Sequence, residues 1–303
     1  MPIPETISYA NMLRTYTDAR SWFEALGAPF GPSSRLAHYH REMGMIASHF
    51  DLGTIEAFSE ERGFQNLVRL LMEVGQINKV YQGLKTLDSP GLRGRLKRMR
   101  TGDPSVLNER REGNNLPRNA AFELEIASLL SLAGFDPNLE GECDIWIEKR
   151  LGCPLAIECK RPFSGESVQK NIEKGLSQLR RRFSERPESR GILFLSLTRA
   201  HDDGSGDESW PLRVINYPEM EAVGTQVMKS FVRDYRRLWE NQRTPSKVIA
   251  VVFHLVMPTL LSEPNELRYF VTSTHCNVFR PTTEENSLSS QIAEAIRKMA
   301  FTY

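Results

Sequence analysis

The sequence predicts an α/β protein in which a mixed central sheet, flanked by helices, follows an all-helical N-terminal region. Three observations predict this class: apolar residues at helical spacing through residues 1–115, two alternating segments at 142–147 and 155–162, and a continuous apolar run at 191–197. We divide the chain into a helical region at 1–115 and a second domain at 116–303. A chain of 303 residues with 40% hydrophobic content can bury a substantial core.

The N-terminal region consists of helical segments separated by glycine or proline. We expect it to serve binding, recognition or dimerisation. The basic segment 90–100, with 102–104 and 113–115, is interpreted as the approach to a linker. The predicted helices cover residues 9–26, 36–50, 54–74 and 77–87.

Residues 119–135 predict an amphipathic helix that opens the second domain, with Asn119 as N-cap and Gly134 at its C-terminal end. Glu123 borders the apolar stripe near the start of this helix, so its carboxylate is expected to project towards the sheet. Glu125 falls nearer the solvent side of the helix. Glu123 is therefore a candidate third carboxylate, beside two in the strands that follow.

The two alternating segments predict a β-hairpin around the glycine-containing loop 149–153. Alternation of this kind is typical of strands with one buried face. If the hairpin is symmetric about the middle of this loop, Ile145 faces Ile157, and Asp144 falls directly opposite Glu158.

This register sorts the side chains of the hairpin by face, because strand residues two apart point the same way. The branched aliphatic residues lie on one face together with Cys159, and the other face carries Asp144, Glu158 and Lys160. Like charges that are directly opposed destabilise a sheet unless something lies between them, and a divalent cation would serve. The alternative is that the three charges form an ordinary solvated face.

The remaining elements extend this sheet. A helix at about 167–183 connects the hairpin to the buried-strand run 191–197, which is a βαβ step. The later predicted elements are a helix at 220–241, strands at 248–256 and 267–274, and a closing helix at 287–299.

The order of helix, hairpin with an aspartate and then Glu-x-Lys, helix and strand resembles the PD-(D/E)XK nuclease superfamily, whose restriction-endonuclease-like core is αβββαβ. The resemblance covers roughly residues 116–200. It matches the family's metal-binding aspartate to Asp144, its (D/E)-x-K element to Glu158-Cys159-Lys160, and its first-helix glutamate to Glu123.

One departure from the family pattern is visible, because Cys143 precedes the matched aspartate where the pattern's name has a proline. That position is the least chemically demanding of the motif. Many members carry a glutamine on the second helix, and Gln178 is the matching candidate.

The residue types suit phosphodiester hydrolysis, which must activate a water, neutralise a pentavalent phosphorane and help an alkoxide leave. Mg²⁺ or Mn²⁺ held by carboxylates can serve all three needs. Asp144 and Glu158 would be the ligands, with the backbone carbonyl of Cys159, and Glu123 would ligate directly or through water. Lys160 would orient the attacking water and offset developing negative charge. Burial would lower the pKa of this lysine, and the carboxylates would raise it.

The formal net charge of +1 means that nucleic-acid affinity must come from local basic patches. That balance suits a nuclease recruited by a protein partner or activator, or one whose groove forms in a homodimer. The candidate nucleic-acid contacts are Arg95, Lys97, Arg118, Arg161 and Gln178, together with the arginine cluster 180–182.

The leading hypothesis is a metal-dependent endonuclease acting on DNA in preference to RNA, and the family makes restriction or anti-phage defence a plausible setting. The alternatives are a DNA repair or recombination nuclease, and a catalytically silent nuclease-fold module that binds nucleic acid or a protein partner through the N-terminal helices. No apolar run approaches the roughly 20 residues of a membrane span, and the N-terminus lacks a signal-peptide pattern. We therefore expect a cytoplasmic protein that does not engage membranes.

Overall fold

The structure is a computed structural model. It describes residues 8–109, 115–148, 152–202, 211–240, 247–262 and 290–292, and the backbone of 266–277. These residues form two compact units, which divide between Leu129 and Leu130. The predicted domain boundary at 115–116 lies earlier in the chain than this division. The difference arises because most of the helix Leu116–Leu132, which we assigned to the second domain, belongs to the N-terminal unit. Among the described helices, none has both the length and the apolar character that crossing a membrane requires.

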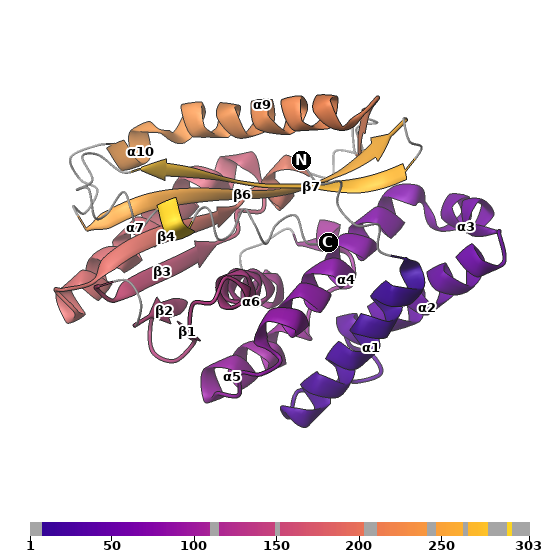
Figure 1. The fold of residues 1–303 in the computed structure, drawn as a ribbon, viewed down its shortest axis with the longest axis horizontal. Coiled ribbons are helices and arrows are strands. Elements are labelled where there is room, and N and C mark those ends of the chain that lie inside the picture. Colours follow the sequence, from indigo (N-terminus) through magenta and orange to yellow (C-terminus); the bar gives the residue numbers. More distant parts are fainter. Residues whose placement is uncertain are drawn as a thin grey trace. The chain divides into compact units, whose positions relative to one another are not determined.

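The N-terminal unit is all-helical, as predicted, and α1 packs on α2 and α4 (Figure 1). Serine side chains begin several helices: the hydroxyl oxygens of Ser8, Ser34 and Ser89 each accept a backbone N–H from the first turn. The elements are α1 (Tyr9–Ala25), α2 (Arg35–Asp51), α3 (Ile55–Arg62), α4 (Phe64–Leu84), α5 (Pro90–Met99), the 3₁₀ helix η1 (Val106–Asn108) and α6 (Leu116–Leu132).

Three predictions for this region were wrong in detail. The chain breaks at Gly63, which has a φ of 80°, and α4 then runs through Gly75 without interruption. The basic segment after residue 89 forms helix α5, because Pro90 suits the first turn of a helix and the Ser89 cap precedes it. Helix α6 begins at Leu116, before the expected N-cap, although it stops as predicted near Gly134.

The second unit contains the predicted mixed sheet, whose strand order is β1-β2-β3-β4-β6-β5, with β7 paired to β6. Strands β1 to β3 are antiparallel, β3, β4 and β6 are parallel, and β7 is antiparallel to β6. The strands are β1 (Pro137–Asn138), β2 (Ile145–Ile147), β3 (Leu155–Lys160), β4 (Arg190–Ser196), β5 (Leu212–Val214), β6 (Val248–Leu261) and β7 (Glu266–Asn277).

The helices of this unit are α7 (Gly165–Glu185), α8 (Thr198–His201), α9 (Tyr217–Tyr235) and α10 (Arg237–Glu240). Side chains of α7, α9 and α10 form one apolar core with a face of the sheet, and Figure 1 shows α9 lying along β6. The single helix predicted at 220–241 is therefore two helices, and residue 241 lies outside the described residues. The strands β1 and β5 were not predicted. Of the predicted closing helix 287–299, the structure describes only helical residues 290–292.

The predicted hairpin register is confirmed: Ile145 pairs with Ile157 and Ile147 with Leu155. The middle of the predicted loop, residues 149–151, lies outside the described residues. The expectation of a single buried face was wrong, because every residue from Leu155 to Cys159 is buried. The physical reason is the crossover: α7 links β3 to the parallel strand β4, and such connections cover a sheet face that a plain hairpin leaves to solvent.

Candidate active site

The carboxylate of Asp144 is fixed against the end of strand β3. Strand β2 begins at Ile145, so Asp144 lies one residue before it and one step beyond the Ile145–Ile157 pair. Its Oδ2 accepts a hydrogen bond of 2.7 Å from the backbone N–H of Cys159. The thiol of Cys143 donates to the carbonyls of Ile145 at 3.3 Å and Ile157 at 3.0 Å. Cys143 therefore ties the start of β2 to β3.

Lys160 brings the two carboxylates together. Its Nζ lies 3.3 Å from Oδ2 of Asp144 and 3.1 Å from Oε2 of Glu158, and it donates to the carbonyl of Cys159 at 2.9 Å. The side chain of Glu158 is 0% exposed and that of Lys160 10%, while that of Asp144 is 20% exposed. The Asp, Glu and Lys of the predicted motif thus form one cluster that is open to solvent chiefly at Asp144.

The pKa values in this cluster follow from burial and from the neighbouring charges. Burial and the nearby Asp144 carboxylate raise the pKa of Glu158 to about 7, although Lys160 acts in the opposite direction. Burial lowers the pKa of Lys160, but Asp144 and Glu158 outweigh this effect, so its pKa lies above the ordinary value. Lys160 is therefore an ammonium at neutral pH and can donate hydrogen bonds.

The cluster is not a solvated face. Glu158 lies in register with Leu193 of β4, which contacts α7 at Gly175, so the Glu158 side chain points at that helix. There Nε of Arg182 lies 3.5 Å from Oε1 of Glu158. Neither of these two atoms makes a hydrogen bond, and both are buried. Burying a carboxylate oxygen without a hydrogen bond costs free energy, so a structural purpose alone does not explain it.

The donor set suits a hard divalent cation. Two adjacent carboxylates and the carbonyl of Cys159 supply only oxygen, and Glu158 Oε1 has spare acceptor capacity. Mg²⁺ is commonly held by one or two carboxylates, with water or substrate phosphate completing its shell. Among the described residues, no group of three or more histidine, cysteine, aspartate or glutamate side chains is arranged to hold a metal. Asp144 and Glu158 would be the ligands of such a cation.

Glu123 lies in the N-terminal unit, where it pairs with Arg95. The Nε of Arg95 donates to Oε2 of Glu123 at 2.8 Å, and both side chains are largely buried. Arg95, predicted to contact nucleic acid, is thus engaged inside its own unit. The expectation that Glu125 faces solvent was wrong, because it is buried and accepts a hydrogen bond of 2.7 Å from Gln76. A helical wheel could not reveal this, since α6 packs within the N-terminal unit on more than one side.

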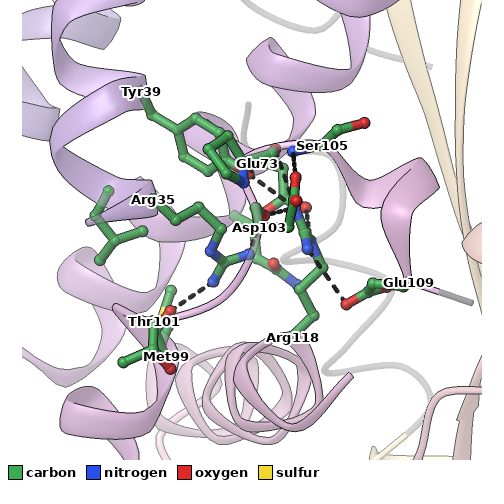
Figure 2. Close-up of polar contacts among 12 residues, drawn as sticks. Arg35, Tyr39, Glu73, Met99, Thr101, Asp103, Ser105, Glu109 and Arg118 are labelled. Carbon is green, nitrogen blue, oxygen red and sulfur yellow. Dashed lines mark hydrogen bonds and ion pairs between the residues drawn. The ribbon is translucent and has the colours of Figure 1, made fainter. Parts of the chain in front are cut away.

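Arg118 lies in a buried network of the same unit (Figure 2). Arg35 of α2 and Arg118 of α6 converge on the Glu73 carboxylate of α4, at 2.8 and 2.5 Å. Arg118 also donates to Glu109 at 3.3 Å and to the hydroxyl of Tyr39 at 2.9 Å. Its side chain is 2% exposed, so phosphate cannot reach it. The predicted nucleic-acid contact at Arg118 is replaced by a structural one.

The other predicted nucleic-acid contacts are accessible to different degrees. Lys97 is exposed on α5, and Arg161, directly after β3, is partly exposed. Gln178 is partly exposed on α7, and its Oε1 is buried without a hydrogen bond. It precedes Arg182 by one helical turn, so both side chains lie on the same side of α7.

The sequence did not single out Arg182 as a member of the site. It was grouped with Arg180 and Arg181, which are exposed, whereas Arg182 is buried. The available signal was its position one turn after Gln178, on the apolar side of an amphipathic helix.

In comparisons with known proteins, the chain matches no protein-family model, no curated protein and no solved structure.

Proposed function

We propose that the protein is a metal-dependent nuclease that hydrolyses phosphodiester bonds, with Asp144, Glu158 and Lys160 at its centre. The observation that carries the proposal is the convergence of these three side chains, with the Lys160 ammonium in contact with Oδ2 of Asp144 and Oε2 of Glu158. The other oxygen of Glu158, Oε1, is buried and lacks a hydrogen bond. A buried cluster with two carboxylates and one lysine is costly to fold, and such costs are typical of functional sites.

Asp144 and Glu158 would hold Mg²⁺ or Mn²⁺, which when bound activates water and neutralises charge on the phosphoryl oxygens. Lys160 would donate hydrogen bonds to the attacking water or to a phosphoryl oxygen, since it remains an ammonium. The order of elements from α6 through β1, β2, β3 and α7 to β4 supports a restriction-endonuclease-like core. We propose DNA as the substrate, by resemblance to that family, and Lys97 and Arg161 as phosphate contacts.

A catalytically silent module is the alternative in another class. It would have no reason to retain Lys160 between two carboxylates, because apolar residues of similar volume stabilise a buried position at least as well as a charged pair. A repair nuclease would share the chemistry of the proposal and would differ in the geometry of its substrate.

The test is cleavage of supercoiled plasmid, linear duplex, single-stranded DNA and RNA, each with Mg²⁺, Mn²⁺ or EDTA. Wild type is compared with Lys160→Ala and with the matched control Lys174→Ala, an exposed lysine of α7. Metal-dependent cleavage that persists in the control and disappears in Lys160→Ala supports the proposal. Cleavage that survives in Lys160→Ala contradicts it, because the activity would then come from another site or a contaminant.

A further inference from the structure

Arg182 of α7 holds together the two parts of the candidate active site that come from different segments of the chain. Its Nη1 lies 2.7 Å from Oε2 of Glu142, and its Nη2 donates to the backbone carbonyl of the same residue. Its Nε lies 3.5 Å from Oε1 of Glu158, and its Nη1 lies 3.2 Å from Oε2 of Glu185. The Arg182 side chain is 5% exposed and that of Glu158 is 0% exposed, so this contact is shielded from bulk water, whereas the side chain of Glu142 is 77% exposed.

Two glycines set the distance between α7 and the sheet that these contacts need. A Cβ on Gly175 would collide with the side chain of Leu193, and one on Gly191 would lie 2.7 Å from the ring of Phe183. The helix and strand β4 therefore approach more closely than larger residues would allow. This close approach brings the Arg182 guanidinium within reach of β3 and of the segment before β2.

The segment held by Arg182 leads directly to Asp144. Glu142 lies two residues before Asp144, and the intervening Cys143 thiol is bonded to strand carbonyls. At the end of this segment, the Asp144 carboxylate accepts a hydrogen bond from the backbone N–H of Cys159. The position of the Asp144 carboxylate thus depends on one anchor from the sheet and one from α7.

We propose that Arg182 is a positioning residue, whose guanidinium fixes the Glu142 segment and the Glu158 carboxylate at the separation that a cation between Asp144 and Glu158 requires. The cation part of this statement rests on the proposed function, whereas the anchoring of Asp144 does not. A planar guanidinium can bind a carboxylate, a carbonyl and a second carboxylate at once, and a lysine ammonium cannot match this geometry. Arg182→Lys should therefore restore only part of what Arg182→Met removes.

Amide exchange tests the anchoring without metal or substrate. The chain has four cysteines, so selective ¹⁵N-cysteine labelling gives few signals, and Cys159→Ser identifies the one of interest. In Arg182→Met the Cys159 amide should exchange about tenfold faster or more, because Asp144 holds it less firmly, and Arg182→Lys should fall between. The control is Arg181→Met, an exposed arginine of the same helix, which should match wild type. An unchanged exchange rate of the Cys159 amide in both Arg182 variants overturns the proposal. If Arg182→Met does not fold, the exchange rate in Arg182→Lys alone decides the outcome.

Mn²⁺ titration then tests the consequence for the cation. The Mn²⁺ concentration for half-maximal binding, measured by electron paramagnetic resonance, should rise about 10–100-fold in Arg182→Met, as for other residues that orient metal ligands. Cleavage at saturating Mn²⁺ should change far less, since Arg182 does not reach the reacting atoms. A lower melting temperature with unchanged Mn²⁺ binding overturns the proposal and leaves Arg182 a purely structural residue. If wild type itself binds no Mn²⁺ and cuts nothing, the proposed function fails, and the exchange result still decides the anchoring.

Discussion

The ammonium of Lys160 lies 3.1 Å from Oε2 of Glu158, a side chain with 0% exposure. The same ammonium contacts Asp144, so it occupies the space between the two carboxylates. A positive charge in this place can assist hydrolysis, but it also competes with a divalent cation for the same oxygens.

Lys160 and Asp144 should therefore fail in different ways when replaced. Asp144→Ala should lose both cleavage and Mn²⁺ binding, because a metal ligand is gone. Lys160→Ala should lose cleavage yet bind Mn²⁺ at least as tightly as wild type, because a competing cation is removed. Calorimetric titration with Mn²⁺ checks this, and loss of binding in Lys160→Ala would show that our division of roles is wrong.

The stability of Glu158→Gln relative to wild type should increase as the pH rises. The pKa of Glu158 is raised by burial to about 7 in the folded protein, so its favourable contribution is complete below about pH 4.5 and is lost as the pH rises through 7. The free energy of unfolding of Glu158→Gln, relative to wild type, should accordingly rise by roughly 1–3 kcal/mol between pH 4.5 and pH 8.

Urea denaturation at the two pH values measures this difference. The exposed Glu140→Gln serves as the control and should shift stability by less than about 0.5 kcal/mol at either pH. A constant difference between Glu158→Gln and wild type would mean that Glu158 is ionised throughout this range.

The stability of the N-terminal unit should depend on the buried ion pairs of Arg118 with Glu73 and Glu109. Arg118→Met leaves Glu73 and Glu109 without one of their partners, and breaking a buried ion pair typically costs about 3–5 kcal/mol. The control is Arg93→Met, which removes an ion pair with Asp88 that is about half exposed on both sides and should hardly matter. Equal melting temperatures for the two variants would contradict the structural role of Arg118.

Gly83→Ala should destabilise the N-terminal unit, whereas Gly75→Ala should not. A Cβ on Gly83 would lie 2.6 Å from the backbone oxygen of Ser128, so α4 and α6 would have to move apart, at a cost of about 1–3 kcal/mol. A Cβ on Gly75, in the same helix, meets nothing within 4 Å. Alanine there should stabilise by about 0.5–1 kcal/mol, and denaturant unfolding of both variants measures the contrast.

Substitutions of Lys97 and of Arg95 should have different effects, because Lys97 is exposed and Arg95 is buried. Lys97→Ala should weaken nucleic-acid binding and reduce the salt slope of the affinity by about 1, as expected for one lost phosphate contact. Arg95→Ala should lower the melting temperature instead, because it breaks the buried pair with Glu123. Binding isotherms at several salt concentrations provide the test. An unchanged salt slope for Lys97→Ala would show that Lys97 is a solvent-exposed charge that does not contact phosphate.

Local chemistry explains what could be predicted from the sequence. The alternation around Ile145 and Ile157 specified the hairpin register, and the register alone placed Asp144 beside Glu158. The mixed sheet and the N-terminal helices followed from periodicity in the same way. The pattern that predicts each of these elements lies within its own segment of the sequence.

The features that were missed depend on partners far along the chain. Arg118 has the composition of a phosphate ligand, but its partner Glu73 lies 45 residues away and only packing reveals it. The burial of Arg182 depends on how α7 is seated on the sheet, which Gly175 and Gly191 determine. A sequence pattern shows that a charge exists, whereas the fold determines whether water, substrate or another side chain meets it.

The bond between Asp144 and the Cys159 amide has a consequence for solubility. Strand β2 pairs with β3 only as far as Ile145 and Ile157, although β3 continues to Lys160. Strand edges that retain unpaired amides invite pairing with other molecules and hence aggregation. The Asp144 carboxylate caps this short edge with a negative charge. Variants with a substitution at Asp144 should therefore be produced and stored at low concentration. Such a substitution removes a barrier to self-association as well as a candidate metal ligand.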